Sequence, residues 1–354
     1  MEYLKLFTQH SDYEEFINGG GGVDLPNVSY CEKENEVHYN PIPTQPNNEI
    51  WYASKDGNIV EPYSGSTTPF LDIDGNNIPI VSNTYENGKG IIKLQKDCYQ
   101  IGDNAFTQCF ELSNIDIPNL VTYIGKGAFS DCTSLNDITI PNSVSSIDNE
   151  AFSYCTSLTG ITIPDSVTFI SSKAFSYCTS LIEVIIPNSI ATIDDMTFSH
   201  CFSLTNIIIP DSVTKIGVCA FNECRSLTGI TIPSTVNKIE NDTFSFCSSL
   251  TGITIPELVT SIGNGAFSSC SSLTGITIPD SVTTIGDEAF QYCSNLSYIT
   301  ILSETPPNLG SKAFFSTYYD IASNLTIYVP SGSANAYKTA ENWLEYADKI
   351  QAIE

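Results

Sequence analysis

The sequence has little positive charge. Its 354 residues include 14 lysines and arginines against 40 aspartates and glutamates, a formal net charge of -26 at pH 7. Binding to nucleic acid or to an anionic membrane needs clustered basic side chains, so this balance argues against both partners. Arg225 is the single arginine of the chain. A clamp of several arginines, which usually binds phosphate groups, is therefore excluded, and this argues against a phosphoryl-transfer enzyme.

Long apolar runs are also absent. No stretch approaches the roughly 18 consecutive apolar residues of a membrane-spanning helix, and the first residues lack the apolar centre of a signal peptide. We therefore expect no membrane insertion and no export by a leader of the chain's own. Charged residues make up only 15% of the chain, below the roughly 25% of an ordinary soluble domain, and neutral polar residues take their place.

What the sequence has in abundance is a repeat of 23 residues. Nine phenylalanines follow this period without an insertion, and a cysteine follows each of them three positions later, from Cys109 to Cys293. The phenylalanines are Phe106, Phe129, Phe152, Phe175, Phe198, Phe221, Phe244, Phe267 and Phe290. A period of this length predicts a solenoid, in which each unit buries its apolar face against its neighbours.

Each repeat predicts one short strand and one turn. Residues 161–163 alternate as a strand with one buried face does, and Pro164 ends it because proline has no N–H to donate. Ala174, Phe175 and Cys178 have the spacing of a helical turn or tight bend. Coils stacked about 4.8 Å apart place equivalent side chains above one another, so we expect one smooth polar wall of threonines without a pocket.

The repeated motif L-T-x-I-T-I-P-x-S-V-T-x-I-G-x-x-A-F-x-x-C-x-S extends from about Ile91 to Ile301. It resembles the BspA-like leucine-rich repeats of gut-bacterial and protist surface proteins and of phage virion proteins. The resemblance implies an adhesion or recognition surface. The inward asparagine of general leucine-rich repeats is missing, and recurrent serines such as Ser157 and Ser180 are expected to make its backbone hydrogen bonds.

Both ends of a solenoid expose strand edges and need covers. Asp-Gly pairs at 56–57 and 74–75 predict hairpin turns before the first coil, and residues 92–94 fit the register of that coil. At the other end, Ser333 is suited to N-cap an amphipathic helix that continues to Ile350, with Trp343 on its apolar side.

We therefore expect a mainly β fold: a right-handed leucine-rich-repeat solenoid of 23-residue coils with a β-hairpin N-terminal cap and a C-terminal helix cap. The expected segments are an attachment segment (1–47), the N-terminal cap (48–95), the solenoid (96–302) and the C-terminal cap (303–354). Within the first, Leu25 to Pro41 resembles a short segment of phage virion appendage proteins, which implies attachment to a larger particle.

The cysteines are predicted to serve packing. Nine lie at one inward repeat position, where cysteine behaves as a small apolar residue, and no C-x-x-C pair occurs. We predict no metal site and no cofactor. The Asp72–Gly75 segment is superficially similar to a calcium loop, but its glycine comes two places early and no glutamate closes the loop.

Two rows of outward side chains are candidate contact residues. Ile185 and Ile208 interrupt the outward threonines of adjacent strands. The second row precedes the cysteines, and its aromatic rings could stack on sugars or anchor a protein partner; alternatively, they simply pack between coils with their hydroxyls in water. Its candidate members are Tyr154, Tyr177, His200, Phe246 and Tyr292.

No catalytic motif is present. The three histidines, His10, His38 and His200, lie far apart in the sequence, and neither a nucleophile elbow nor a phosphate-binding loop occurs. We therefore predict a noncatalytic recognition or structural appendage protein. Its expected partners are a cell-surface glycan or protein and, through residues 1–47, a virion or other particle; self-association into a homo-oligomer is compatible with this function. The predicted location is the virion surface, with the bacterial cell surface as the alternative. The alternative function is a polysaccharide-degrading enzyme that uses two carboxylates.

Overall fold

The computed structural model describes residues 28–31, 36–39, 45–316, 320–321 and 323–353. The chain forms two compact units, Met1–Pro46 and Asn47–Glu354. In the first, strand β1 (Val28–Cys31) pairs antiparallel with strand β2 (Glu36–Tyr39). The remainder of the predicted attachment segment, apart from residues 45–47, lies outside the described residues.

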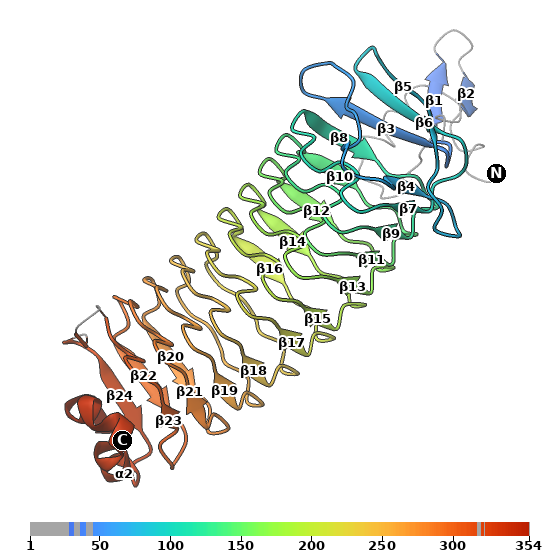
Figure 1. Cartoon of the computed structure of the whole chain (residues 1–354). Coiled ribbons are helices and arrows are strands. Elements are labelled where there is room, and N and C mark those ends of the chain that lie inside the picture. The colour runs from blue at the N-terminus through green and yellow to red at the C-terminus, as the bar shows by residue number, and fades with distance from the viewer. Residues whose placement is uncertain (1–27, 32–35, 40–44, 317–319, 322, 354) are drawn as a thin grey trace. The chain divides into compact units, whose positions relative to one another are not determined.

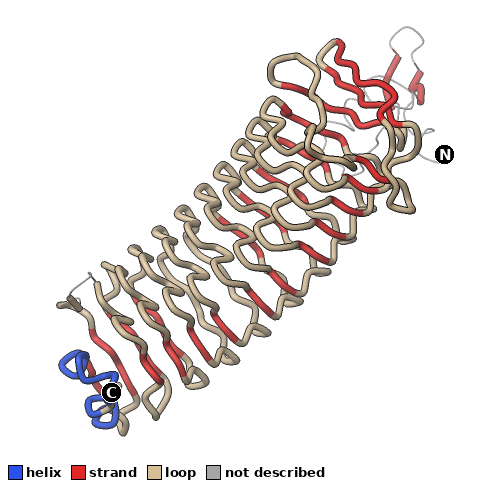
Figure 2. The backbone as a smooth tube through the Cα atoms, in the orientation of Figure 1, coloured by secondary structure: helices blue, strands red, loops and turns tan. Residues whose placement is uncertain are grey.

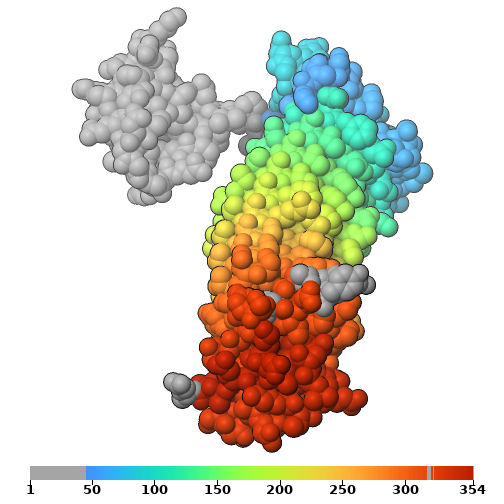
Figure 3. All heavy atoms as spheres, turned by 90° about the vertical axis from the view of Figure 1, so that its left-hand side faces the viewer, coloured from blue at the N-terminus to red at the C-terminus, as the bar shows by residue number. Residues whose placement is uncertain are grey.

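The second unit is a mainly β solenoid of about 11 coils with a repeat near 23 residues, as the period predicted. Figure 1 shows its coils stacked in a row, and the space-filling view in Figure 3 shows them as consecutive bands of colour. Each coil contributes to two columns of parallel strands, which Figure 2 shows in red. We call these columns ladder A and ladder B.

Ladder A contains the strand predicted in each repeat. Ile185 and Ile208 of neighbouring strands are direct partners in its register, so equivalent positions do lie side by side. An isolated bridge between Thr231 and Thr254 continues the column where regular pairing is interrupted. Its strands are β8 (Leu112–Asp116), β10 (Asp137–Thr139), β12 (Gly160–Thr162), β14 (Glu183–Ile185), β16 (Asn206–Ile208), β20 (Gly275–Ile278), β22 (Tyr298–Ile301) and β24 (Thr326–Val329).

Ladder B follows the proline turn of each coil. Val167 N–H donates to the carbonyl of Pro164 at 3.0 Å, which reverses the chain toward the second strand. Its strands are β7 (Gln100–Ile101), β9 (Tyr123–Ile124), β11 (Ser146–Ile147), β13 (Phe169–Ile170), β15 (Thr192–Ile193), β17 (Lys215–Ile216), β18 (Lys238–Ile239), β19 (Ser261–Ile262), β21 (Thr284–Ile285) and β23 (Asn308–Leu309). The sequence motif predicted one strand per repeat, so this second, two-residue strand is a correction.

The third side of each coil is a turn, as the spacing of Ala174, Phe175 and Cys178 predicted. We call the stacked turns the turn column. Phe152 N–H donates to the Ala174 carbonyl of the next coil at 2.8 Å, and Tyr154 N–H donates to Ser176 in the same way at 2.8 Å. These bonds recur along the stack. Backbone pairing therefore joins the coils on this side as well, although no regular strand forms.

The core is a set of columns, one for each inward repeat position. The phenylalanine rings from Phe106 to Phe290 are buried. Neighbouring rings are nearly parallel, with centroids 5.1 to 5.7 Å apart. This separation is typical of offset stacking, which is more favourable than direct face-to-face contact.

The inward cysteines pack in the core and also donate hydrogen bonds from their thiols. Cys178 Sγ lies 3.1 Å from the Phe152 carbonyl oxygen of the preceding coil, and the equivalent contact recurs from Cys132 to Cys293. Burial raises the pKa of the Cys178 thiol to about 12, so the thiol keeps the proton that it donates. Among the serines expected to supply backbone hydrogen bonds, Ser157 does so between coils: its Oγ donates to the Thr133 carbonyl of the preceding coil at 2.6 Å.

The N-terminal cap confirms one of the two predicted hairpin turns. At Asp74-Gly75 the chain turns back on itself, with an antiparallel bridge between Leu71 and Asn77 and a bond from Ile78 N–H to the Phe70 carbonyl at 2.8 Å, whereas the strand before Asp56-Gly57 pairs elsewhere. Strand β3 (Glu49–Ser54) lies between β8 and β6 (Lys89–Leu94) and pairs antiparallel with both. The tight hairpin joins β5 (Ile80–Glu86) to β6 through residues 87–88, whose positive φ angles, 51° and 82°, suit Asn-Gly. Residues 92–94 are therefore one strand away from ladder A. Strand β4 (Phe70–Leu71) covers β7 at the end of ladder B.

The C-terminal cap contains a short helix, as expected, but the helix is interrupted. Helix α2 (Ala334–Thr339) is followed by the 3-10 helix η2 (Glu341–Lys349) and by strand β25 (Ile350–Ala352) on β24. Ser333 occupies the N-cap position without a side-chain capping bond. Trp343 is buried and donates from Nε1 to the Pro307 carbonyl at 2.9 Å. Among the described residues, no helix has the length and apolarity needed to cross a bilayer.

We expect Phe175→Ala to lower the free energy of unfolding by about 3–5 kcal/mol, because it leaves a cavity in the middle of the stacked column. Urea unfolding followed by circular dichroism measures this change. Phe169→Ala is the matched control, because the Phe169 side chain is 47% exposed, and its effect should stay within about 0.5 kcal/mol. Equal effects of the two substitutions would contradict the proposed importance of the phenylalanine column.

Candidate functional site

An exposed apolar patch lies on ladder A. Ile185 is 61% exposed and Ile208 is 63% exposed, as expected for outward positions, and the two are register partners on β14 and β16. Ile182, just before β14, is 48% exposed. We call Ile185 and Ile208, which are direct neighbours, the isoleucine patch. Single exposed apolar residues are common on protein surfaces, whereas contiguous ones more often mark a contact surface.

Three members of the aromatic row stack on one another in the turn column. The ring centroids of Tyr154 and Tyr177 are 4.4 Å apart, and those of Tyr177 and His200 are 4.1 Å apart, with nearly parallel planes. All three residues have a positive φ near 60°, which bends the chain so that their side chains leave the coil side by side. Most ring faces are thus covered by neighbouring rings, and edges remain for contact.

His200 is held by its surroundings. Its Nδ1 lies 2.8 Å from Ser199 Oγ, and burial lowers its pKa below the ordinary value. The ring is therefore neutral at pH 7. Beside the stacked rings runs a groove of about 420 Å³, whose lining includes Glu150 and Lys173. These two form an ion pair at 3.2 Å, so the groove wall carries no uncompensated charge at that point.

The seven predicted contact residues do not form one site. Phe246 and Tyr292 occupy the same repeat position as His200, but Glu223 and Ser269 separate them from it and from each other. Phe246 is 46% exposed and Tyr292 is 38% exposed. The structure therefore brings together two groups on different sides of the coil, the isoleucines on ladder A and the tyrosine–histidine stack on the turn column.

The expected smooth threonine wall is wrong, although its threonines are exposed. Ladder A contains shallow grooves where a glycine stands two residues before the outward threonine of a coil, as in Gly160-Ile161-Thr162. One groove of about 520 Å³ lies over Gly160. A second of about 690 Å³ and a third of about 440 Å³ share residues 252–254, so they form one continuous groove over Gly229, Gly252 and Gly275.

The ring of Tyr298 lies across the end of this continuous groove. A Cβ atom on Gly275 would stand 2.1 Å from Tyr298 Cζ and 2.4 Å from each Cε atom. Near-equal distances to three atoms place the ring face, and not its edge, over Gly275. The side chain is 46% exposed, and no other aromatic ring of the described residues stacks on it. Its outer face is therefore open to solvent.

Two carboxylates line the groove over Gly160. Asp137 and Glu183 belong to the coils on either side of that glycine, and both are exposed. Their backbones are two coil spacings apart, about 10 Å. Within the described part of the chain, no cluster of three or more His, Cys, Asp or Glu side chains has the arrangement of a metal site.

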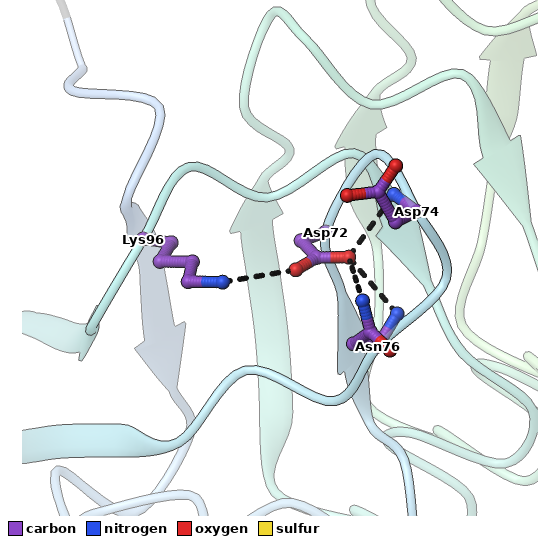
Figure 4. A network of polar contacts seen from close by, with 4 residues as sticks. All are labelled: Asp72, Asp74, Asn76 and Lys96. Carbon is purple, nitrogen blue, oxygen red and sulfur yellow. Dashed lines mark hydrogen bonds and ion pairs between the residues drawn. The ribbon is translucent and has the colours of Figure 1, made fainter.

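Asp72 in the loop after β4 is a structural residue. Figure 4 shows its carboxylate between the loop and Lys96. Oδ1 accepts from Asp74 N–H at 3.0 Å and from Asn76 N–H at 2.9 Å, and Oδ2 accepts from Lys96 Nζ at 3.1 Å. Oδ1 therefore holds the loop that carries the Asp-Gly turn, and Oδ2 joins that loop to Lys96.

Comparison with known proteins shows the family of this chain. Two overlapping segments, residues 99–228 and 191–319, match the model of the BspA type leucine rich repeat region, with six copies. Together they span more than half of the chain. The chain belongs to the BspA-type leucine-rich-repeat family. A search of curated proteins gives no significant match.

Solved structures of similar proteins include a leucine-rich cell surface protein from Faecalibacterium prausnitzii A2-165, with 29% identity and a TM-score of 0.49. The alignment covers 83% of this chain and 94% of that one. A leucine-rich repeat protein from Bacteroides ovatus ATCC 8483 is 26% identical with a TM-score of 0.31, and the alignment covers 78% of this chain and 91% of that one.

Sequence reasoning missed the groove that this BspA-type solenoid carries on ladder A. The signal was present: Gly229, Gly252 and Gly275 occupy one repeat position in three successive coils. Tyr298 follows them at the same position in the next coil. Patterns of apolar and aromatic side chains do not reveal such a groove, because it arises from the absence of a side chain.

We expect Asp72→Asn to lower the melting temperature at pH 7. The hydrogen bond from Asn76 N–H is the main reason why the pKa of Asp72 lies below its ordinary value near 4, and the neighbouring Lys96 lowers this pKa further. A lowered folded-state pKa stabilises the fold above the unfolded-state value, and this contribution is lost as pH falls through the folded-state pKa. The melting-temperature difference from wild type should therefore shrink below about pH 4.

Asp74→Asn is the control for this measurement, because Asp74 contributes its backbone N–H to Asp72, and the substitution leaves that group in place. Calorimetric melting of the three proteins from pH 3 to pH 7 compares them directly. A constant difference between wild type and Asp72→Asn across this range would contradict the assigned role of the carboxylate.

Proposed function

We propose that this protein is a noncatalytic recognition protein whose solenoid presents fixed side chains to a macromolecular partner at a surface. The observation that carries the proposal is the isoleucine patch. Its members project from a hydrogen-bonded ladder, so they lose little conformational freedom when a partner covers them. An enzyme needs convergent reactive groups, whereas a flat array of exposed side chains suits contact over an area.

The chemistry of the patch favours a protein partner. Isoleucine side chains offer no hydrogen bond to a sugar hydroxyl, but they gain free energy when apolar side chains of another protein cover them. The stack of Tyr154, Tyr177 and His200 supports the same conclusion, because most of its ring faces are covered by a neighbouring ring. Sugars stack on open ring faces, and the edges and hydroxyls that remain suit a polar protein surface better.

We place the protein at a bacterial cell surface. Membership of the BspA-type family is compatible with this location, which the sequence analysis kept as the alternative. Attachment to a virion rests on sequence resemblances alone, those of the repeats and of residues 25–41, and neither the family match nor the similar structures supports it. We therefore leave the virion out of the proposal.

The enzyme alternative keeps one supporting observation, the pair Asp137 and Glu183 on opposite sides of one groove. Hydrolysis of a glycosidic bond needs one acid held protonated in a water-excluded setting. Both side chains are exposed, so the groove does not supply this setting. Release of reducing sugar from a polysaccharide by the wild-type protein, abolished by Asp137→Asn, would favour the enzyme.

We expect the double substitution Ile185→Asn, Ile208→Asn to weaken binding by at least about ten-fold, because it makes the patch polar. The measurement is saturable binding of labelled protein to immobilised cell-surface and extracellular-matrix proteins. Thr139→Asn with Thr162→Asn is the matched control at the same repeat position. Unchanged binding by the isoleucine variant would remove the patch as the contact surface.

A further inference from the structure

The continuous groove on ladder A differs chemically from the isoleucine patch beside it. It runs from Asn206 to Tyr298, across four coil spacings or about 19 Å. Its wider part is lined only by threonine, asparagine, isoleucine and glycine. Glu257 is the one acidic residue of its narrower part. In a chain with a net charge of -26, this lining is close to neutral.

The groove offers the two kinds of contact that a sugar chain uses. Exposed threonines, among them Thr228, Thr231 and Thr254, border it. Each hydroxyl both donates and accepts hydrogen bonds, as sugar hydroxyls do. At the end of the groove, the open face of Tyr298 is a platform for the C–H face of a sugar ring. In the tyrosine–histidine stack of the turn column, Tyr177 is covered on both faces, and only the outer faces of the two end rings remain.

The repeat of the coils also matches an extended glycan. Thr231, Thr254 and Thr277 occupy one repeat position and recur once per coil, about 4.8 Å apart. Successive rings of an extended β-linked polysaccharide advance by a similar distance, so one ring can lie over each coil. Weak contacts of this kind add up along a chain that engages several coils.

We propose that the groove between Asn206 and Tyr298 binds a neutral, linear, β-linked glycan, with one sugar ring over Tyr298 and others over Gly252 and Gly229. This site goes beyond the proposed protein-binding function and shares only Ile208 with the isoleucine patch. The glycines are part of the site because any side chain there would occupy the space of the sugar.

The decisive variant fills the groove without disturbing the fold. A Cβ atom at Gly252 would meet nothing within 4 Å, and its φ is not in the left-handed region, so Gly252→Thr places an ordinary strand residue there. Gly160→Thr is the matched control, because Gly160 has the same repeat position and the same open space but lies over the other groove.

The experiment titrates the full chain with cellohexaose, xylohexaose, mannohexaose and laminarihexaose by isothermal calorimetry. We expect at least one to bind, Gly252→Thr to weaken that binding by ten-fold or more, and Gly160→Thr to leave it within about two-fold. Tyr298→Ala should weaken it by about ten-fold, whereas Tyr298→Phe, which keeps the ring, should stay near wild type.

Two results would overturn the glycan site. The first is that none of the four hexasaccharides binds to the wild-type chain. The second is binding that survives both Gly252→Thr and Tyr298→Ala. Ile185→Asn separates this test from that of the protein-binding patch: the residue does not line the groove, so glycan binding should be unchanged in that variant even where protein binding is lost.

Discussion

The structure depends on hydrogen bonds between equivalent positions of successive coils. Where ladders A and B are interrupted, the turn column continues to pair backbone to backbone, as between Phe221 N–H and the Thr243 carbonyl at 2.9 Å. Pairing of this kind fixes the register, because an offset of one residue would move every inward side chain outward. The stacked phenylalanines and the thiol-to-carbonyl bonds both follow from that register.

The period of the sequence was enough to predict the solenoid because every coil has the same length. A strict repeat of Phe, Cys and Pro leaves one arrangement in which equal residues meet. The caps have no such repeat, and there local signals misled: the Asp-Gly pair at 56–57 follows a strand that pairs elsewhere, while the tight hairpin forms at the Asn-Gly pair, 87–88. Strand β3 is inserted next to β8 by long-range pairing, which no local pattern encodes.

The candidate contact residues were only partly predictable for a related reason. Outward direction follows from the repeat, so exposure of Ile185, Ile208 and Tyr154 could be foreseen. The mutual stacking of Tyr177 and His200 requires the left-handed backbone at those positions, which a sequence of non-glycine residues does not suggest. The ladder A groove depends on where side chains are missing and on the ring of Tyr298 lying back over Gly275, a rotamer choice set by the neighbouring coil.

Ile208 connects the two proposed surfaces, because it belongs to the isoleucine patch and also lines the groove. A protein and a free glycan that both use it would compete at that coil. A single partner that carries both apolar side chains and a neutral glycan would instead use both surfaces at once, and the stacked coils would hold the two contacts at a fixed spacing. Linked contacts on one rigid support bind far more tightly than either alone when the spacing fits. The repeat architecture thus supplies the geometry that turns individually weak contacts into selective recognition.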